Sequence, residues 1–209
     1  MAHVAGVAGA VREWWLRAIL VLQSPRPVFV ALRSDDPDDV SARSEPVLAI
    51  VLLSGIAFVL ATRTAAHLMD DSDYDGLLVA VWAFLAGGLF GTVAYWALGG
   101  LLHWSSVILG SEGTFRRSRQ VLAFSAVPVA LSLVLWPVKL ALYRSAVFHA
   151  GGSDSRGGGQ VLAWLWVAFE LWAAGLLVVG VRSVHGWTWG RSALAAAPPI
   201  VVCALAALA

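Results

Sequence analysis

Two ionisable side chains lie inside long apolar runs of this sequence and are the first candidates for chemistry. Glu170 lies near the middle of the run 161–181, and Lys139 lies near the end of the run 121–142. A carboxyl group at membrane depth is costly and suggests a proton relay, an ion pathway or a polar contact between helices. A protonated or hydrogen-bonded glutamate that holds helices together is the structural alternative. Lys139 can extend to water along its aliphatic stem, or it can reach toward Glu170.

An acidic turn imitates the beginning of a calcium-binding loop. Asp71, Asp73, Asp75 and Gly76 match the pattern D-x-D-x-D-G. Such a loop needs a bidentate glutamate at its twelfth position. Trp82 stands there instead. A solvated acidic turn is therefore expected in place of a calcium loop, and weak cation binding is the alternative.

Other patterns that carry chemistry are incomplete. The glycine-rich stretch 151–159 lacks a Gly-Lys-Ser/Thr ending, so it is no phosphate loop and is expected to be a flexible connector. The five histidines are too scattered to form a metal cluster. No Ser/His/Asp or Cys/His constellation for nucleophilic catalysis can be proposed. The basic loops lack the size and repetition expected of a nucleic-acid-binding site. We expect no enzyme, no cofactor and no bound metal.

Five apolar runs must position these residues. Apolar residues make up 59% of the chain and charged residues 13%, whereas a globular domain carries about 25% charged residues. A helix needs roughly 20 residues to cross the hydrocarbon core. The sequence therefore predicts an all-α integral membrane protein, a bundle of about five transmembrane helices in one domain, 46–209. The runs are 46–62, 77–98, 121–142, 161–181 and 192–209.

Two of these runs are irregular. The uncharged stretch 76–111 is longer than one crossing. It is either one bent span or a span followed by an interfacial helix, with the bend expected at Gly99-Gly100. The last run contains Pro198-Pro199, which frees backbone hydrogen-bonding groups that neighbouring helices or water must satisfy.

The first 45 residues are expected to form a separate cytoplasmic segment. Apolar side chains recur at helical spacing from Val11 to Leu22, which favours an amphipathic helix lying on the membrane surface. Pro25 and Pro27 are expected to end that helix. The acidic stretch 33–43 is expected to be a solvated linker.

The basic residues predict the orientation. With five spans and the N-terminus inside, ten of the fourteen Lys and Arg residues lie on the cytoplasmic side. The positive-inside rule therefore places the N-terminus in the cytoplasm and the C-terminus outside a plasma membrane.

Gly87 and Gly91 in the second span form a small-xxx-small pattern that allows helices to approach closely. The partner is either another helix of the same bundle or a second copy of the chain, so a homo-oligomer is one possibility.

Two loops and the N-terminal segment carry the most specific local sequences. The loop 110–120 contains glycine, phenylalanine and three arginines, and it leads into a span that bears a proline. The loop 180–193 contains a Gly-x-Arg-x-x-His-Gly pattern, and Pro25 to Phe29 forms a Pro-x-x-x-Phe-like pattern. The residues that carry these patterns in the two loops are Gly110, Gly113, Phe115, Phe124, Pro128, Arg182, His185 and Gly186.

Together these patterns resemble the bacterial branch of the Yip family, the Ypt/Rab-interacting membrane proteins, over roughly Trp14 to the C-terminus. The resemblance implies five spans, no enzymatic activity and a cytoplasmic N-terminus. It also implies a membrane-organising or adaptor role. In that role Arg116, Arg117 and Arg119 face anionic lipids of the bilayer or an unknown protein partner. Ordinary positive-inside topology is the alternative explanation of these basic residues. A small transporter or permease that uses Glu170 is the alternative.

Overall fold

The computed structural model describes residues 2–71, 73–155 and 157–208, and that part of the chain is helical, with no strand. Five of its helical stretches are long and apolar enough to cross a membrane. This confirms the all-α architecture with five spans. The α-helices are α1 (Ala2–Leu20), α2 (Pro25–Ala31), α3 (Pro37–Ala42), α4 (Ser44–Leu60), α5 (Gly76–Ile108), α6 (Phe115–Ser125), α7 (Val127–Leu131), α8 (Leu135–Tyr143), α9 (Gly158–His185) and α10 (Trp189–Leu208). The short 3-10 helices are η1 (Ala65–Asp70), η2 (Ser132–Val134), η3 (Arg144–Phe148) and η4 (Ser153–Ser155).

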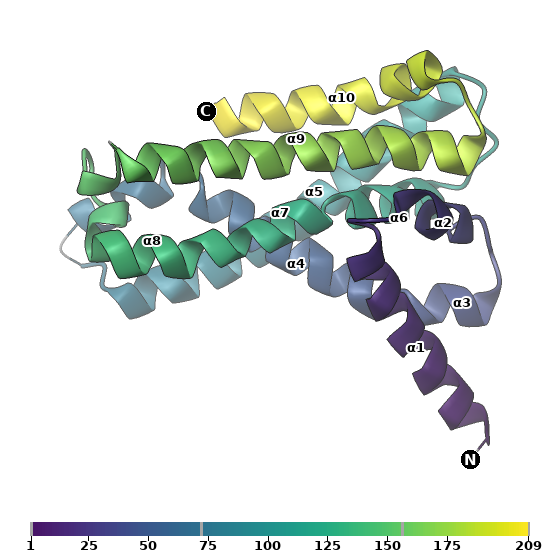
Figure 1. Ribbon diagram of the computed structural model, residues 1–209, viewed down its shortest axis with the longest axis horizontal. Helices are drawn as coiled ribbons and strands as arrows, with labels where there is room; N and C mark the ends of the chain where they lie inside the picture. Colours follow the sequence, from purple (N-terminus) through teal and green to yellow (C-terminus); the bar gives the residue numbers. More distant parts are fainter. Residues whose placement is uncertain (1, 72, 156, 209) are drawn as a thin grey trace.

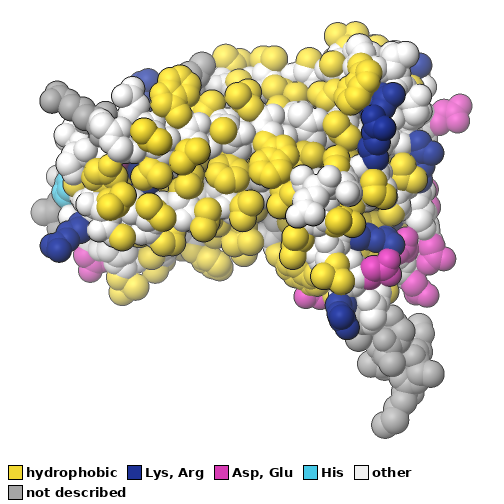
Figure 2. Space-filling view, viewed as in Figure 1, with side chains coloured by type: hydrophobic (Ala, Val, Ile, Leu, Met, Phe, Trp, Pro, Cys, Tyr) yellow, Lys and Arg dark blue, Asp and Glu magenta, His cyan; other side chains and the backbone are white. Residues whose placement is uncertain are grey.

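The long helices run along one axis of the molecule, and α1 leaves the bundle at an angle near one end (Figure 1). We call this end, which holds α2, α3 and the α9–α10 connection, the arginine-rich end after Arg33, Arg117, Arg182 and Arg191. The end formed by η1, η3 and η4 is the opposite end. Apolar side chains cover the middle of the face in Figure 2, and charged side chains gather toward the ends. That distribution is the one expected of a bundle that spans a bilayer.

The closest approach between spans joins α4 and α5 at three glycines. A Cβ atom on Gly91 would lie 2.3 Å from the carbonyl oxygen of Val51, and one on Gly55 would lie 2.1 Å from the carbonyl oxygen of Gly87. A Cβ atom on Gly87 would lie 2.6 Å from the Cα atom of Ile56. The Gly87 and Gly91 pattern therefore packs within one bundle, where the missing side chains let two backbones touch.

The structure distinguishes the two alternatives for the second span at Gly99-Gly100. Helix α5 continues through both glycines for 33 residues, so the stretch is one span, without a separate interfacial helix after it. A Cβ atom on Gly99 would lie 2.3 Å from Cγ of Arg119. The glycine makes room for a neighbouring side chain, and the helical hydrogen bonds of α5 carry the chain across it.

The third span is divided, although the sequence suggested one helix over 121–142. Helix α6 ends at Ser125, and α7, η2 and α8 follow it in line (Figure 1). Pro128 lies in the first turn of α7, where its missing N–H group costs no hydrogen bond. The proline thus begins a new helix after Ala126, and it is fully buried there.

Helix α10 contains Pro198 and Pro199 without breaking. Because Pro199 has no N–H group, the carbonyl oxygen of Ala195 lacks its usual donor from four residues later. The hydroxyl group of Ser105 on α5 donates to that oxygen at 2.7 Å. For this oxygen, a neighbouring helix supplies the partner, which is one of the two alternatives expected.

The N-terminal segment packs on the bundle more closely than expected. Trp14, Ala18 and Val21 are buried in the main core, whereas Leu16 and Ile19 on other faces of α1 are exposed. Pro25 and Pro27 lie in the first turns of α2. The stretch 33–43 is no simple linker, since it contains α3 and ends at Arg43, whose exposed fraction is 0%.

Polar contacts also organise the opposite end. Lys139 forms an ion pair with Asp154 at 3.4 Å, so of the two alternatives for this side chain the one that brings it to Glu170 is not adopted. A Cβ atom on Gly159 would lie 1.8 Å from the carbonyl oxygen of Asp154, so the start of α9 packs closely against the backbone of Asp154. The amide of Ala150 donates to Asp70, and this bond, with help from His67, lowers the pKa of the Asp70 carboxyl group. Asp75, from the calcium-like turn, caps α5 by accepting from the Leu78 amide.

We predict that Gly91→Ala destabilises the protein by about 1–3 kcal/mol, because the new methyl group forces α4 and α5 apart. Unfolding in mixed micelles with increasing sodium dodecyl sulfate, followed by circular dichroism, measures this. Gly175→Ala is the matched control, since nothing lies within 4 Å of a Cβ atom there. Alanine in a helix should leave that variant unchanged or stabilise it by about 0.5–1 kcal/mol. Equal stability of the two variants contradicts the packing role of Gly91.

Candidate interaction surface at the arginine-rich end

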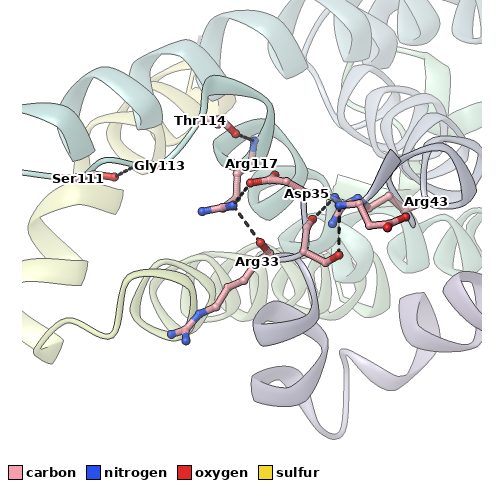
Figure 3. Close-up of polar contacts among 9 residues, drawn as sticks. Arg33, Asp35, Arg43, Ser111, Gly113, Thr114 and Arg117 are labelled. Carbon is pink, nitrogen blue, oxygen red and sulfur yellow. Dashed lines mark hydrogen bonds and ion pairs between the residues drawn. The ribbon is translucent and has the colours of Figure 1, made fainter. Parts of the chain in front are cut away.

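Three segments that are distant in the sequence meet at the arginine-rich end. Arg117, in the first turn of α6, donates to the carboxylate of Asp35 and, at 3.0 Å, to the carbonyl oxygen of Arg33. Figure 3 shows the Arg117 side chain directed at both groups. Arg33 in turn donates to the carbonyl oxygen of Ser183 near the end of α9. The N-terminal segment is therefore tied to both of the loops singled out in the sequence.

The two loops also contact each other directly. The hydroxyl group of Ser111 lies 3.3 Å from Nδ1 of His185 and accepts from the amide of Gly113 at 2.9 Å. A Cβ atom on Gly113 would lie 3.0 Å from Cε1 of His185, so a larger residue would push the loops apart. Arg191 donates to the carbonyl oxygen of Leu109. These contacts bring the end of α5 against the α9–α10 connection.

Both loops need glycine at a helix end. Gly110 follows α5 with φ +80°, and Gly186 follows α9 with φ +70°. Glycine reaches this left-handed region without the steric cost that a Cβ atom brings. The amide of Gly186 donates to the carbonyl oxygen of Arg182 at 2.8 Å and closes the last turn. Thr114 begins α6 by accepting from the amide of Arg117.

Arg119 lies among aromatic rings on the side of α5. Its guanidinium carbon is 3.6 Å from the ring centre of Trp96, 4.7 Å from that of Phe115 and 5.1 Å from that of Tyr95. Phe115 also packs edge-on against His103. Cation–π contacts of this kind stabilise by about 0.5–2 kcal/mol. Arg119 thus helps to join α5 and α6.

Aromatic contacts hold the second loop in the same way. The Arg182 guanidinium lies over Trp189 at 4.5 Å, and that of Arg191 lies over Trp187 at 4.2 Å. His185 stacks on Trp187 with ring centres 4.5 Å apart. The two arginines therefore stabilise the conformation of this loop through contacts with its own tryptophans.

An apolar core supports the surface from below. Phe29 has an exposed fraction of 0% and lies against Gly180, where a Cβ atom would be 2.9 Å from its ring. Phe124 is equally buried, and its ring centre lies 5.6 Å from that of Trp14. The Pro-x-x-x-Phe-like pattern thus places a phenylalanine in a gap that only glycine leaves open on α9.

The three basic residues predicted as one group have different environments. Arg117 is largely buried and paired, Arg119 is partly buried among rings, and Arg116 is exposed. The sequence reasoning did not single out Asp35 or Arg43. Arg43 is completely buried and donates to the carbonyl oxygen of Ser34 at 2.6 Å. No local pattern in the sequence marks it as an interior residue.

The comparisons with known proteins agree with this arrangement. The model of the Yip1 domain matches residues 19–209, which include all three converging segments. The chain belongs to the Yip1 domain family. Yip1 domain proteins form a non-enzymatic family of membrane trafficking, which confirms that this protein is not an enzyme. No curated protein and no solved structure matches the chain.

The intramembrane carboxyl group of this Yip1 domain protein lies apart from the arginine-rich end. Glu170 is halfway along α9 and partly buried, and it lines a cavity between the spans. Its Oε1 atom is buried and has no hydrogen-bond partner among the described residues. Lys139, paired with Asp154, does not neutralise it.

We predict that Arg117→Gln releases the N-terminal segment from the bundle. Losing the ion pair with Asp35 and the bond to the Arg33 carbonyl should cost about 1–2 kcal/mol. Limited trypsin digestion followed by mass spectrometry should then show cleavage after the buried Arg43 several-fold sooner. Arg116→Gln, at the exposed neighbouring position, should leave that rate unchanged. Equal cleavage rates in both variants would show that Arg117 does not hold the segment.

Proposed function

We propose that this Yip1 domain protein is a membrane-organising or adaptor protein whose arginine-rich end contacts anionic lipid headgroups or a cytoplasmic protein. The observation that carries the proposal is the convergence of the N-terminal segment with both family-like loops. Those contacts bring three separate parts of the chain together at one end of the bundle. The described residues at the arginine-rich end form structural contacts and suggest binding, in keeping with a non-enzymatic family.

The exposed residues of this end fit a membrane surface. Three arginines are exposed: Arg12 on α1, Arg26 in the first turn of α2 and Arg116 in the first turn of α6. Helix α1 also presents Trp15, with Leu16, Ile19 and Leu20, outside the core. An amphipathic helix with basic residues beside apolar ones binds the interface between headgroups and acyl chains. These features support α1 as an interfacial helix.

The orientation is part of the proposal. Ten of the fourteen basic residues lie in the N-terminal segment 12–43, in the first turns of α6, near the end of α9 and near the start of α10. These parts of the chain lie at or next to the arginine-rich end. The positive-inside rule assigns that end to the cytoplasm of a plasma membrane. The protein would then present its converging loops to cytoplasmic partners and to the inner leaflet.

A transport function finds less support. The cavity beside Glu170 has walls that are almost entirely apolar. An ion or proton pathway needs a series of polar groups or water, which such walls do not favour.

Cysteine labelling tests the orientation. On a Cys203→Ser background, we expect an impermeant maleimide added outside intact cells to label only positions 73 and 153. Labelling at position 41, 112 or 190 would reverse the proposed topology. Every chosen residue is exposed, so a lack of labelling reports the side of the membrane. The single variants are Ser41→Cys, Asp73→Cys, Glu112→Cys, Ser153→Cys and Gly190→Cys.

Lipid selectivity tests the surface itself. In reconstituted bilayers, we expect spin-labelled phosphatidylserine to associate with the protein more strongly than spin-labelled phosphatidylcholine. Each basic residue near an anionic surface contributes about 1 kcal/mol, so each neutralisation should lower the preference about fivefold. The variant that combines Arg12→Gln, Arg26→Gln and Arg116→Gln should abolish most of it.

The matched control is Arg119→Gln, because the Arg119 guanidinium faces aromatic rings. It should change lipid preference little and reduce thermal stability instead. An unchanged preference in the triple variant would remove lipid binding from the proposal and leave a protein partner as the ligand of this end.

A further inference from the structure

A partly open cavity of about 330 Å³ lies between the spans. Helices α4, α5, α6, α7, α9 and α10 all contribute to its wall, through residues such as Val51, Phe58 and Leu177. The volume lies within the range of roughly 300–1,000 Å³ found for small-molecule sites. Protein interiors are usually close-packed with side chains. The atoms that line an empty cavity therefore lose van der Waals contacts, which a bound molecule would restore.

Few polar groups interrupt the apolar wall, and the hydroxyl groups of Ser54 and Ser125 already donate to backbone carbonyl oxygens of their own helices. Glu170 is the only acidic residue among those that line the cavity, and its Oε1 atom is buried without a partner among the described residues. Trp166 lies one turn earlier on α9, lines the same cavity, and its Nε1 atom is also without a partner. Polar groups left unpaired in an apolar medium cost free energy. A ligand that supplies a hydrogen-bonding group at this position would recover that cost.

The cavity opens toward the outer flank of the bundle. Two residues of its wall, Phe90 on α5 and Leu171 on α9, have exposed fractions of 37% and 68%. These residues belong to segments that cross the membrane, where the surroundings are acyl chains. A molecule would therefore enter from the bilayer, and it must itself be soluble in lipid.

We propose that this cavity binds a neutral amphipathic lipid that carries a hydroxyl headgroup, with the hydroxyl at Glu170 and the hydrocarbon part in the apolar remainder. A hydroxyl group both donates and accepts, so it can pair with a carboxyl group in either protonation state. An ammonium headgroup would instead require a buried ion pair, for which both charges must be desolvated. The arginine-rich end plays no part in this site, and the inference is independent of the function proposed for it.

Photolabelling of the whole protein in bilayers tests this site. The probe is 1-decanol with a diazirine in its chain, and the comparison probe is the same diazirine-bearing decane without the hydroxyl group. We expect the alcohol to label peptides of α9 and α10 that line the cavity. Excess unlabelled 1-decanol should compete for this labelling, and excess decane should not.

Variants separate the headgroup contact from simple filling of space. Glu170→Leu should lower the competitor-sensitive labelling about three- to tenfold, which is the effect expected for one lost hydrogen bond. Glu170→Gln retains a donor and an acceptor and should keep most of the labelling. Ala174→Phe, within the wall, should abolish labelling by both probes, whereas Ala80→Phe, on the exposed side of α5, should not.

Each result decides the matter once gel filtration and circular dichroism show that the variants are folded. Equal labelling by the alcohol and the alkane, or undiminished labelling in Glu170→Leu, would overturn the role of the hydroxyl group. Labelling that survives Ala174→Phe would place the molecule outside the cavity. Stronger competition by decylamine than by decanol would also overturn the proposal, because the ligand would then be a cation.

Discussion

The fold depends on a few positions where a side chain is missing. Helices in a bilayer gain little from the hydrophobic effect when they associate, so close packing of backbones has to hold them together. Gly55, Gly87 and Gly91 let α4 and α5 touch, and Gly99 makes room for Arg119 on α6. Gly180 admits Phe29 from the N-terminal segment to the flank of α9. The same device therefore joins the spans to each other and the N-terminal segment to the spans.

That last contact explains why the arginine-rich end is one surface. Once Phe29 lies against α9, the chain that follows it must pass the start of α6, where Arg117 binds Asp35 and the Arg33 carbonyl. Two kinds of arginine result. Some make their contacts within the protein: Arg117 and Arg43 donate to backbone carbonyl oxygens, and Arg119 lies over an aromatic ring. Arg116, in contrast, is exposed at the surface. The same basic loop therefore holds the fold together through some of its arginines and offers another arginine for contact with a ligand.

Two polar groups at membrane depth, one on α10 and one on α9, differ in whether they have a hydrogen-bond partner. The carbonyl oxygen of Ala195, freed by Pro199, receives the Ser105 hydroxyl group from α5. The Oε1 atom of Glu170 has no such partner among the described residues and lies by a cavity. An unpaired polar group beside a cavity is one that a bound molecule can satisfy. Our proposal for the cavity rests on this contrast.

The sequence by itself determined the membrane class, the number of spans and the family-like segments, because hydrocarbon thickness and backbone satisfaction permit few alternatives for such apolar runs. It also anticipated that a neighbouring helix or water must satisfy groups freed by Pro198-Pro199, as Ser105 does for the Ala195 carbonyl oxygen. Only the tertiary structure decided that α5 continues through Gly99, that Lys139 pairs with Asp154, and that Arg43 is buried. These features depend on contacts between residues far apart in the chain. A glycine that breaks a helix and one that admits a neighbouring side chain look the same in a sequence, and only the packed neighbour distinguishes them.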